Sequence, residues 1–201
     1  MKRLGRRTRL RGNTGKREQR NGIQRGNVQL PAVFQVVGYK NSGKTTLICA
    51  LIPLLKQRGC SVAVIKHDAH NYDMDHHGTD TWKQRQAGAA AVAITNNTRT
   101  SVIEERGSSL SKLIADFSGY DYVIVEGFKQ EAYPKIVLLH SDEDRILLKQ
   151  ASNIAAIAVW ETMEQAAITE NWHDKLFSIN DSEGIANLLW EQRSDFQNFN
   201  I

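Results

Sequence analysis

The feature that most constrains the fold is the glycine-rich segment 38–45 (GYKNSGKT), which lies between two apolar segments of different period. The residues before it, 32–37, form a short, β-branched apolar run that is typical of a buried strand. The residues after it, 45–59, carry leucines at helical spacing and end in a glycine. A strand, a glycine loop and a helix in this order predict an α/β fold with the loop at the carboxyl edge of a parallel sheet.

The same segment predicts a site for a nucleoside triphosphate. Two glycines separated by four residues and followed by Lys-Thr match the phosphate-binding loop of nucleotide triphosphatases. Backbone N–H groups of such a loop face the phosphates, the lysine contacts the β- and γ-phosphates, and the hydroxyl ligates Mg²⁺. Lys44 is therefore also a candidate catalytic residue. The expected nucleotide contacts are Gly38, Asn41, Ser42, Gly43, Lys44, Thr45 and Thr46. Lys40 either adds a second positive charge or faces solvent.

A carboxylate for the metal is expected at the end of another central strand. Residues 120–126 form such a strand, and it ends in Glu126 followed by Gly127. We expect Glu126 and Thr45 to hold Mg²⁺, with a water between the longer glutamate and the metal. The alternative is an acid that only ends a strand. Lys129 either adds charge near the phosphates or is a solvated loop residue.

The segment 67–80 is polar and rich in His and Asp, which predicts a loop leaving the sheet on the same edge. One interpretation is a switch-like loop in which Asp68, Asp75 or Asp80 orients the Mg²⁺ shell or the attacking water. The other is a zinc site, although the histidine spacing fits no known zinc signature. The histidines concerned are His67, His70, His76 and His77.

The remaining pattern predicts a single domain over 31–201. The fold class expected is a three-layer α/β sandwich of the P-loop NTPase type with a mostly parallel central sheet and a β-hairpin extension. The expected strands are 61–66, 89–95, 98–104, 135–140, 153–159 and 175–180. The expected helices are 81–86, 108–117, a turn within 142–150 and a terminal helix from Asp181. Pro53 is expected to bend the first helix.

Charge and cysteine content suggest where such a chain works. Residues 1–30 hold ten Lys or Arg and one acid, so the rest of the chain is net negative. This basic segment reads as a disordered extension, and because no aromatic residue is interleaved we do not expect nucleic acid as a partner. Cys49 and Cys60 are expected to be buried free thiols. With no apolar run of membrane length and no signal segment, we expect a cytoplasmic protein without a membrane partner.

Taken together, these segments resemble the molybdopterin-guanine dinucleotide biosynthesis protein B (MobB) family. The resemblance is carried by residues 36–47, 65–70, 75–81, 87–89 and 125–129, and it covers about residues 32–160. It implies a GTP-binding protein with slow, Mg²⁺-dependent hydrolysis that forms homodimers. It also implies an adapter for the guanylyltransferase that attaches GMP to molybdopterin, with molybdopterin itself as a further candidate ligand. The family pattern Gly-Lys-Asp-Ser stands here as 78–81 (GTDT), so Asp80 is kept as a candidate catalytic residue while the lysine is replaced by Thr79.

Two questions stay open at this stage. A small-molecule kinase would share the loop but would need an acceptor pocket and an arginine-bearing lid. The arginines near a plausible lid are scattered in sequence: Arg85, Arg99, Arg106 and Arg145. The guanine-selective Asn-Lys-x-Asp element is absent, and Glu161 and Thr162 are guesses for base contacts.

Overall fold

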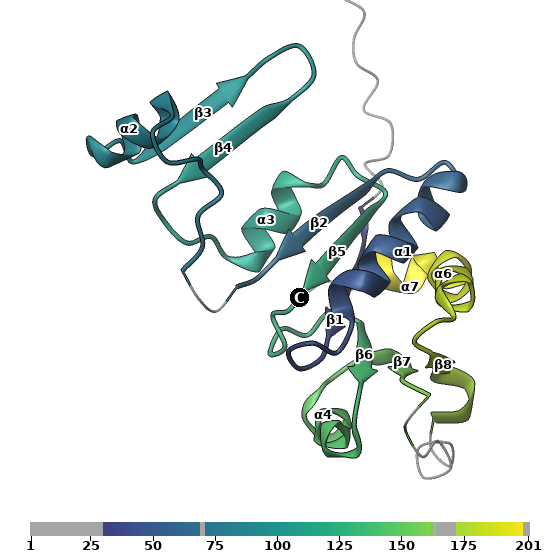
Figure 1. The fold of residues 1–201 in the computed structure, drawn as a ribbon. Coiled ribbons are helices and arrows are strands. Elements are labelled where there is room, and N and C mark those ends of the chain that lie inside the picture. The colour runs from purple at the N-terminus through teal and green to yellow at the C-terminus, as the bar shows by residue number, and fades with distance from the viewer. Residues whose placement is uncertain (1–29, 69–70, 162, 164–171, 199–201) are drawn as a thin grey trace, which may run out of the picture.

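The computed structural model describes residues 30–68, 71–161, 163 and 172–198 (Figure 1). Its central sheet has six parallel strands in the order β2-β5-β1-β6-β7-β8. These strands are β1 (Ala32–Val37), β2 (Val62–Lys66), β5 (Tyr122–Glu126), β6 (Lys135–Leu139), β7 (Ile154–Val159) and β8 (Leu176–Ser178). Because all six run in one direction, their carboxyl ends meet at one edge of the sheet, where ligands bind in such folds.

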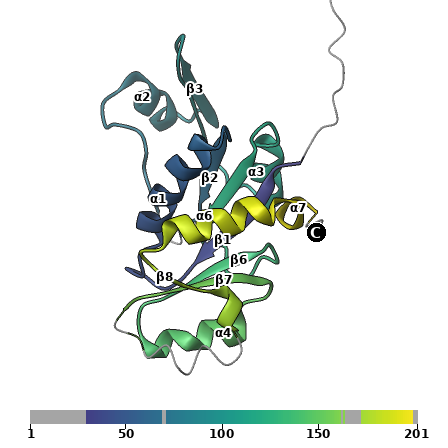
Figure 2. The same ribbon diagram turned by 90° about the vertical axis from the view of Figure 1, so that its right-hand side faces the viewer.

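Helices cover both faces of this sheet, as Figures 1 and 2 show. On one face lie α1 (Lys44–Gln57), α6 (Ser182–Glu191) and α7 (Arg193–Gln197), and on the other lie α3 (Leu110–Asp116) and α4 (Ile146–Gln150). A short 3₁₀ turn, η1 (Asp142–Arg145), leads into α4, and another, η2 (His173–Lys175), leads into β8. The expected three-layer sandwich is thus confirmed.

Alternate residues of the central strands supply the two apolar layers. Phe34 and Val36 of β1 pack with Leu51 of α1 and Leu189 of α6 in the larger cluster. The neighbouring residues of β1 face the opposite side of the sheet, where Val33 packs toward α3. On that same side α4 covers β6 and β7. A strand buried on both faces reads as one continuous apolar run, which is the reason β1 and β5 are recognisable from sequence.

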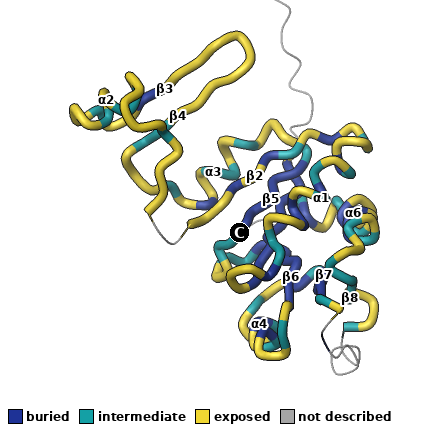
Figure 3. The backbone as a smooth tube through the Cα atoms, viewed as in Figure 1, coloured by how far each residue is buried: buried dark blue, intermediate teal, exposed yellow. Residues whose placement is uncertain are grey.

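The hairpin extension stands apart from the sheet. It comprises α2 (Asp80–Gln86), β3 (Ala91–Thr95) and β4 (Thr100–Glu104), and we call residues 71–107 the arm. β3 and β4 pair antiparallel with each other in a separate two-stranded sheet. Figure 3 shows that most of the arm is exposed, in contrast to the buried strands of the main sheet.

The sequence placed these elements well, with small shifts at their ends. The turn at Asn96 was predicted, and its side chain accepts bonds from the backbone N–H groups of Thr98 and Arg99. α1 continues through Pro53. One prediction was wrong: Cys60 is buried but Cys49 is exposed, because it lies on the face of α1 away from Leu47, Ile48 and Leu51. In the described part of the chain, no helix is long and apolar enough to span a bilayer.

Candidate functional site

The loop between β1 and α1 has the backbone that a phosphate nest requires. Asn41 and Gly43 adopt left-handed conformations, with φ of 62° and 95°. Alternating left- and right-handed residues turn successive N–H groups toward one point, where an anion binds. Gly38 has no room for a side chain, since a Cβ there would lie 2.4 Å from Ser42 Oγ and 3.2 Å from Leu138. Packing therefore requires the first glycine of the motif, and the left-handed backbone favours the second.

The first turn of α1 is open to an anion. Among the described residues no side chain caps this helix, and its first turn carries no acid. In contrast, side chains of Thr79, Ser109 and Asp181 cap α2, α3 and α6. The free N–H groups and the positive end of the helix dipole thus point toward the loop.

Lys44 lies across the loop. Its ammonium donates to the carbonyl oxygens of Gly38, at 3.2 Å, and Tyr39, at 2.7 Å. Burial lowers its pKa below the ordinary lysine value, the charge of Glu126 opposes this, and the charges of Lys129 and Lys66 add to the lowering. A bound polyanion would raise the pKa of Lys44 again, because a nearby negative charge favours the charged form of a lysine.

Thr45 and Glu126 supply the oxygen donors for a metal. The Thr45 hydroxyl lies 3.2 Å from each carboxylate oxygen of Glu126, which is only 8% exposed. A hydroxyl and a carboxylate are hard oxygen ligands of the kind Mg²⁺ prefers, and Mg²⁺ binds proteins through one or two such groups plus phosphates and waters. The donor set therefore fits Mg²⁺ beside a nucleotide phosphate.

A cavity of about 470 Å³ joins these groups. It is lined by Lys40, Asn41, Gly43, Lys44, Thr45, Thr46, Glu126 and Trp160. Most of the nucleotide contacts expected from the sequence thus share one cavity. Gly38 and Ser42 are not in the lining. Ser42 is buried beneath the loop, with its hydroxyl near Gly38.

Trp160 also lines the cavity, and sequence reasoning missed it. Its indole Nε1–H donates to the Ser42 carbonyl at 3.0 Å, and its ring lies 5.0 Å from that of His140. A Cβ on Gly43 would come within 3.4 Å of this indole. Trp160 directly follows β7, so the rule that places ligands beyond strand ends could have identified it.

The loop after β5 is held by a buried amide. Gln35 is fully buried in β1, and its Nε2 donates to the carbonyl oxygens of Gly127, at 3.0 Å, and Phe128, at 2.6 Å. Both acceptor residues are left-handed, with φ of 98° and 51°. This conformation is strained for phenylalanine. The next residue, Lys129, lies over the ring of Tyr39, 4.2 Å from its centroid, at the rim of the phosphate loop.

Asp80 is not brought to this cavity. It opens α2 with its side chain 94% exposed and pairs with Lys83 at 3.7 Å. The prediction that it orients water at the phosphates therefore lacks support within one chain. Sequence order set it on the loop after β2, but that loop runs outward into the arm (Figure 1).

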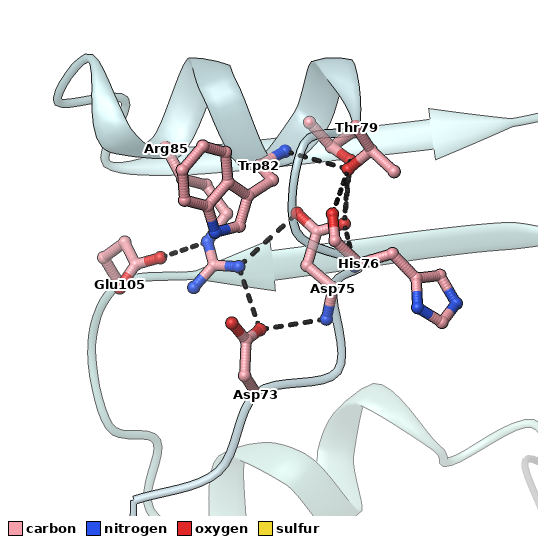
Figure 4. Close-up of polar contacts among 8 residues, drawn as sticks. Asp73, Asp75, His76, Thr79, Trp82, Arg85 and Glu105 are labelled. Carbon is pink, nitrogen blue, oxygen red and sulfur yellow. Dashed lines mark hydrogen bonds and ion pairs between the residues drawn. The ribbon is translucent and has the colours of Figure 1, made fainter.

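Asp75 has a structural role instead (Figure 4). Its carboxylate accepts from the hydroxyls of Thr79, at 3.1 Å, and Thr81, at 3.0 Å. It also pairs with Arg85 at 3.4 Å, as Asp73 does at 3.2 Å, while Glu105 holds the same guanidinium at 2.5 Å. Arg85 thus joins the loop before α2, α2 itself and the end of β4. Because Asp75 is held in this cluster, it does not fit the interpretation of a switch-like loop.

Two of the described histidines in the same segment lie against different aromatic rings. The ring of His67 lies 4.5 Å from that of Phe128, and the ring of His77 lies 4.2 Å from that of Trp82. Within the described residues no three His, Cys, Asp or Glu side chains gather as a metal site would require. His70 and Thr162 lie outside the described residues, as does most of the basic segment 1–30.

Comparisons with known proteins point to one family. Residues 33–160 match the family model described as molybdopterin guanine dinucleotide synthesis protein B. The chain is 44% identical over 121 residues to the molybdopterin-guanine dinucleotide biosynthesis adapter protein of Haemophilus influenzae, covering 58% of this chain and 67% of that protein. It is 31% identical over 183 residues to the adapter protein of Escherichia coli, covering 85% and 98%.

Solved structures give the same result. The crystal structure of a MobB homologue from Bacillus stearothermophilus is similar with a TM-score of 0.63 at 30% identity, covering 82% of this chain and 99% of that one. HypB from Helicobacter pylori, at 16% identity and a TM-score of 0.50, covers 86% and 92% and shares the fold alone. The family match over residues 33–160 contains every residue that lines the cavity. The chain is therefore a member of the molybdopterin guanine dinucleotide synthesis protein B family.

Proposed function

We propose that this chain is a GTP-binding adapter protein that assists the attachment of GMP to molybdopterin in molybdenum cofactor biosynthesis. The observation that carries the proposal is the single cavity in which the loop amides, Lys44 and the Thr45–Glu126 pair converge. The relatives named above support the pathway. GTP and Mg²⁺ are the ligands of this site, and the cytoplasm is the compartment in which the chain works.

Hydrolysis at this site is slow. Lys44 and the loop amides stabilise negative charge on the transferring phosphoryl group, and Mg²⁺ neutralises further charge when bound. Among the described residues that line the cavity, however, the only carboxylate is Glu126, and it is engaged by Thr45 and Lys66. No second carboxylate among these described lining residues is left to orient a water, so the nucleotide serves mainly as a bound ligand.

Two copies of the chain form a homodimer through the arm. A two-stranded hairpin is at best marginally stable alone, and both of its edges can pair further. Ile94 and Val102 are 60% and 61% exposed on its strands. Ile94 pairs with Ser101 and Val102 with Ala93, so the two side chains lie on opposite faces of the hairpin. A second copy presents the same side chains, so a two-fold contact between arms buries one of these faces in each copy. Light scattering should report a dimer for the full chain and a monomer for Ile94→Asp/Val102→Asp.

The second partner is the molybdenum cofactor guanylyltransferase, with molybdopterin as a further ligand. The test combines the purified chain with that enzyme, molybdopterin, GTP and Mg²⁺, and measures molybdopterin guanine dinucleotide. The wild-type chain should raise the yield, and Lys44→Ala should not. An unchanged yield with the wild-type chain would contradict the adapter role.

The alternative, a small-molecule kinase, gains no support from the arginines. Arg85 is held by three carboxylates, Arg106 by Glu104 and Arg145 by Asp142. No described arginine lines the cavity. With GTP labelled on the γ-phosphate, the adapter should release only free phosphate, whereas a kinase would label an acceptor.

A further inference from the structure

The carboxylate of the Mg²⁺ site already has a cationic partner from the chain itself. Lys66 is the last residue of β2, directly opposite Glu126 in the β2–β5 register. Its Nζ lies 3.5 Å from Glu126 Oε1. Thr45 approaches the same carboxylate from α1. A hydroxyl and an ammonium thus surround the oxygens that would receive the metal.

This ion pair cannot persist unchanged when the metal binds. Mg²⁺ demands close, near-octahedral oxygen coordination, and an ammonium within ion-pair distance of the same oxygens is repelled by the metal's charge. The Lys66 side chain is 56% exposed, so its stem is not packed in place. Lysine carries its charge on a flexible four-carbon stem and can turn to a new partner while its backbone stays fixed.

The order of the strands determines which partner is within reach. β2 lies outside β5, which carries Glu126, whereas Trp160 follows β7 on the far side of β1. Lys66 therefore approaches the cavity from the metal end. A metal held by Thr45 and Glu126 would contact the terminal phosphate of a bound triphosphate, so that phosphate would lie at the same end.

We propose that Lys66 is a second phosphate-binding cation, which pairs with Glu126 in the nucleotide-free protein and turns to the γ-phosphate when Mg²⁺·GTP binds. The inference rests on the proposed function, because it assigns a role within the same nucleotide site. It makes the chain selective for triphosphate over diphosphate. Lys44 contacts the phosphate loop itself and contributes to the affinity for both GTP and GDP.

The test is calorimetric titration of the full chain with GTP and with GDP, each in Mg²⁺. Lys66→Met should lower the affinity for GTP about ten- to a hundredfold, the range for losing a hydrogen bond between charged groups. GDP affinity should change less than about twofold. Lys66→Arg should retain most of the preference for GTP. Lys112→Met removes another exposed, ion-paired lysine, on α3, and is the matched control.

A second titration separates phosphate binding from simple charge balance with Glu126. In Glu126→Gln the carboxylate charge is gone, and EDTA removes the metal. If Lys66 binds the γ-phosphate, adding Lys66→Met to this variant still weakens GTP but not GDP. If Lys66 serves only as a counter-ion, the added substitution has no effect, and the inference is overturned.

The outcomes also separate the two proposals. A wild-type chain that binds neither nucleotide overturns the proposed function and this inference with it. A wild-type chain that binds both, with an unchanged GTP-to-GDP ratio in Lys66→Met, overturns only the role of Lys66. An equal loss of affinity for GTP and GDP in Lys66→Met would also overturn only the role of Lys66, because the contact would then not be with the terminal phosphate.

Discussion

The hydroxyl of Thr45 lies 3.2 Å from both carboxylate oxygens of Glu126, although 81 positions separate the two residues in sequence. Parallel pairing of β1 with β5 produces this contact, since it brings the start of α1 and the end of β5 to one sheet edge. The fold alone brings these two oxygen donors together, and the proposed triphosphate would complete the site.

Removing the Thr45 hydroxyl should uncouple nucleotide from metal. Thr45→Val keeps the shape of the side chain but loses the oxygen, so GTP affinity in Mg²⁺ should fall about tenfold, while affinity in EDTA should stay near wild type. Titration of GTP under both conditions measures this, with Thr45→Ser as the control that restores the oxygen. An equal loss with and without metal would argue against a metal ligand here.

Binding of GTP should take up protons at alkaline pH. Burial lowers the pKa of Lys44 in the free protein, and a bound triphosphate raises it again. Between these two pKa values the free lysine is partly neutral and the bound one is charged. Affinity should therefore decline as pH rises through the lowered pKa. Titrations in buffers of different ionisation enthalpy should show uptake at alkaline pH and none near neutrality; proton release would contradict this role of Lys44.

Asp80 is the residue for which sequence and structure make opposite predictions. Its carboxylate lies on the arm and is 94% exposed. Asp80→Asn should therefore leave both GTP affinity and the rate of phosphate release within about twofold of wild type. Glu126→Gln, in the same assay, should lower both in Mg²⁺. A large loss of phosphate release in Asp80→Asn would mean that an arm reaches a phosphate site.

Arg85 should govern the stability of the arm. Its side chain is only 14% exposed and joins Asp73, Asp75 and Glu105. Arg85→Met leaves these carboxylates without their shared partner and should lower the free energy of opening the arm by about 1–3 kcal/mol. Hydrogen exchange over residues 71–107 measures this opening. Arg106→Met, at a 69% exposed ion pair, should change it little. Similar exchange in both variants would show that the Arg85 cluster does not hold the arm.

The elements around the phosphate loop were predictable because their signals are local. The run 32–37 is apolar except for Gln35, the glycine spacing follows it directly, and 122–126 repeats the apolar pattern before Glu126. Each of these local patterns predicts its own secondary structure. Because the carboxyl ends of parallel strands share one edge of the sheet, Glu126 is then expected beside the phosphate loop. That rule also applies to Lys66 and Trp160, which end or follow strands, but side-chain chemistry alone did not single them out.

The path of the segment 67–80 could not be read in the same way. Its composition predicted a loop at the correct edge but not the direction of that loop. Direction is set by the tertiary contacts of Arg85 with Asp73 and Glu105, the latter 20 residues further on. The prediction that Cys49 is buried was wrong for a related reason. Helical spacing places it among apolar neighbours, and only the packing of α1 shows which face of the helix is covered.

The most direct measurement is the equilibrium binding of GTP to the full chain in Mg²⁺, compared with Lys44→Ala and with ATP as competitor. The loop amides, Lys44 and the Thr45–Glu126 pair should retain one GTP per chain in the wild type, and Lys44→Ala should lose nearly all affinity while keeping its fold. A wild-type chain that retains no purine triphosphate, or a Lys44→Ala variant that binds GTP equally well, would contradict the assigned site.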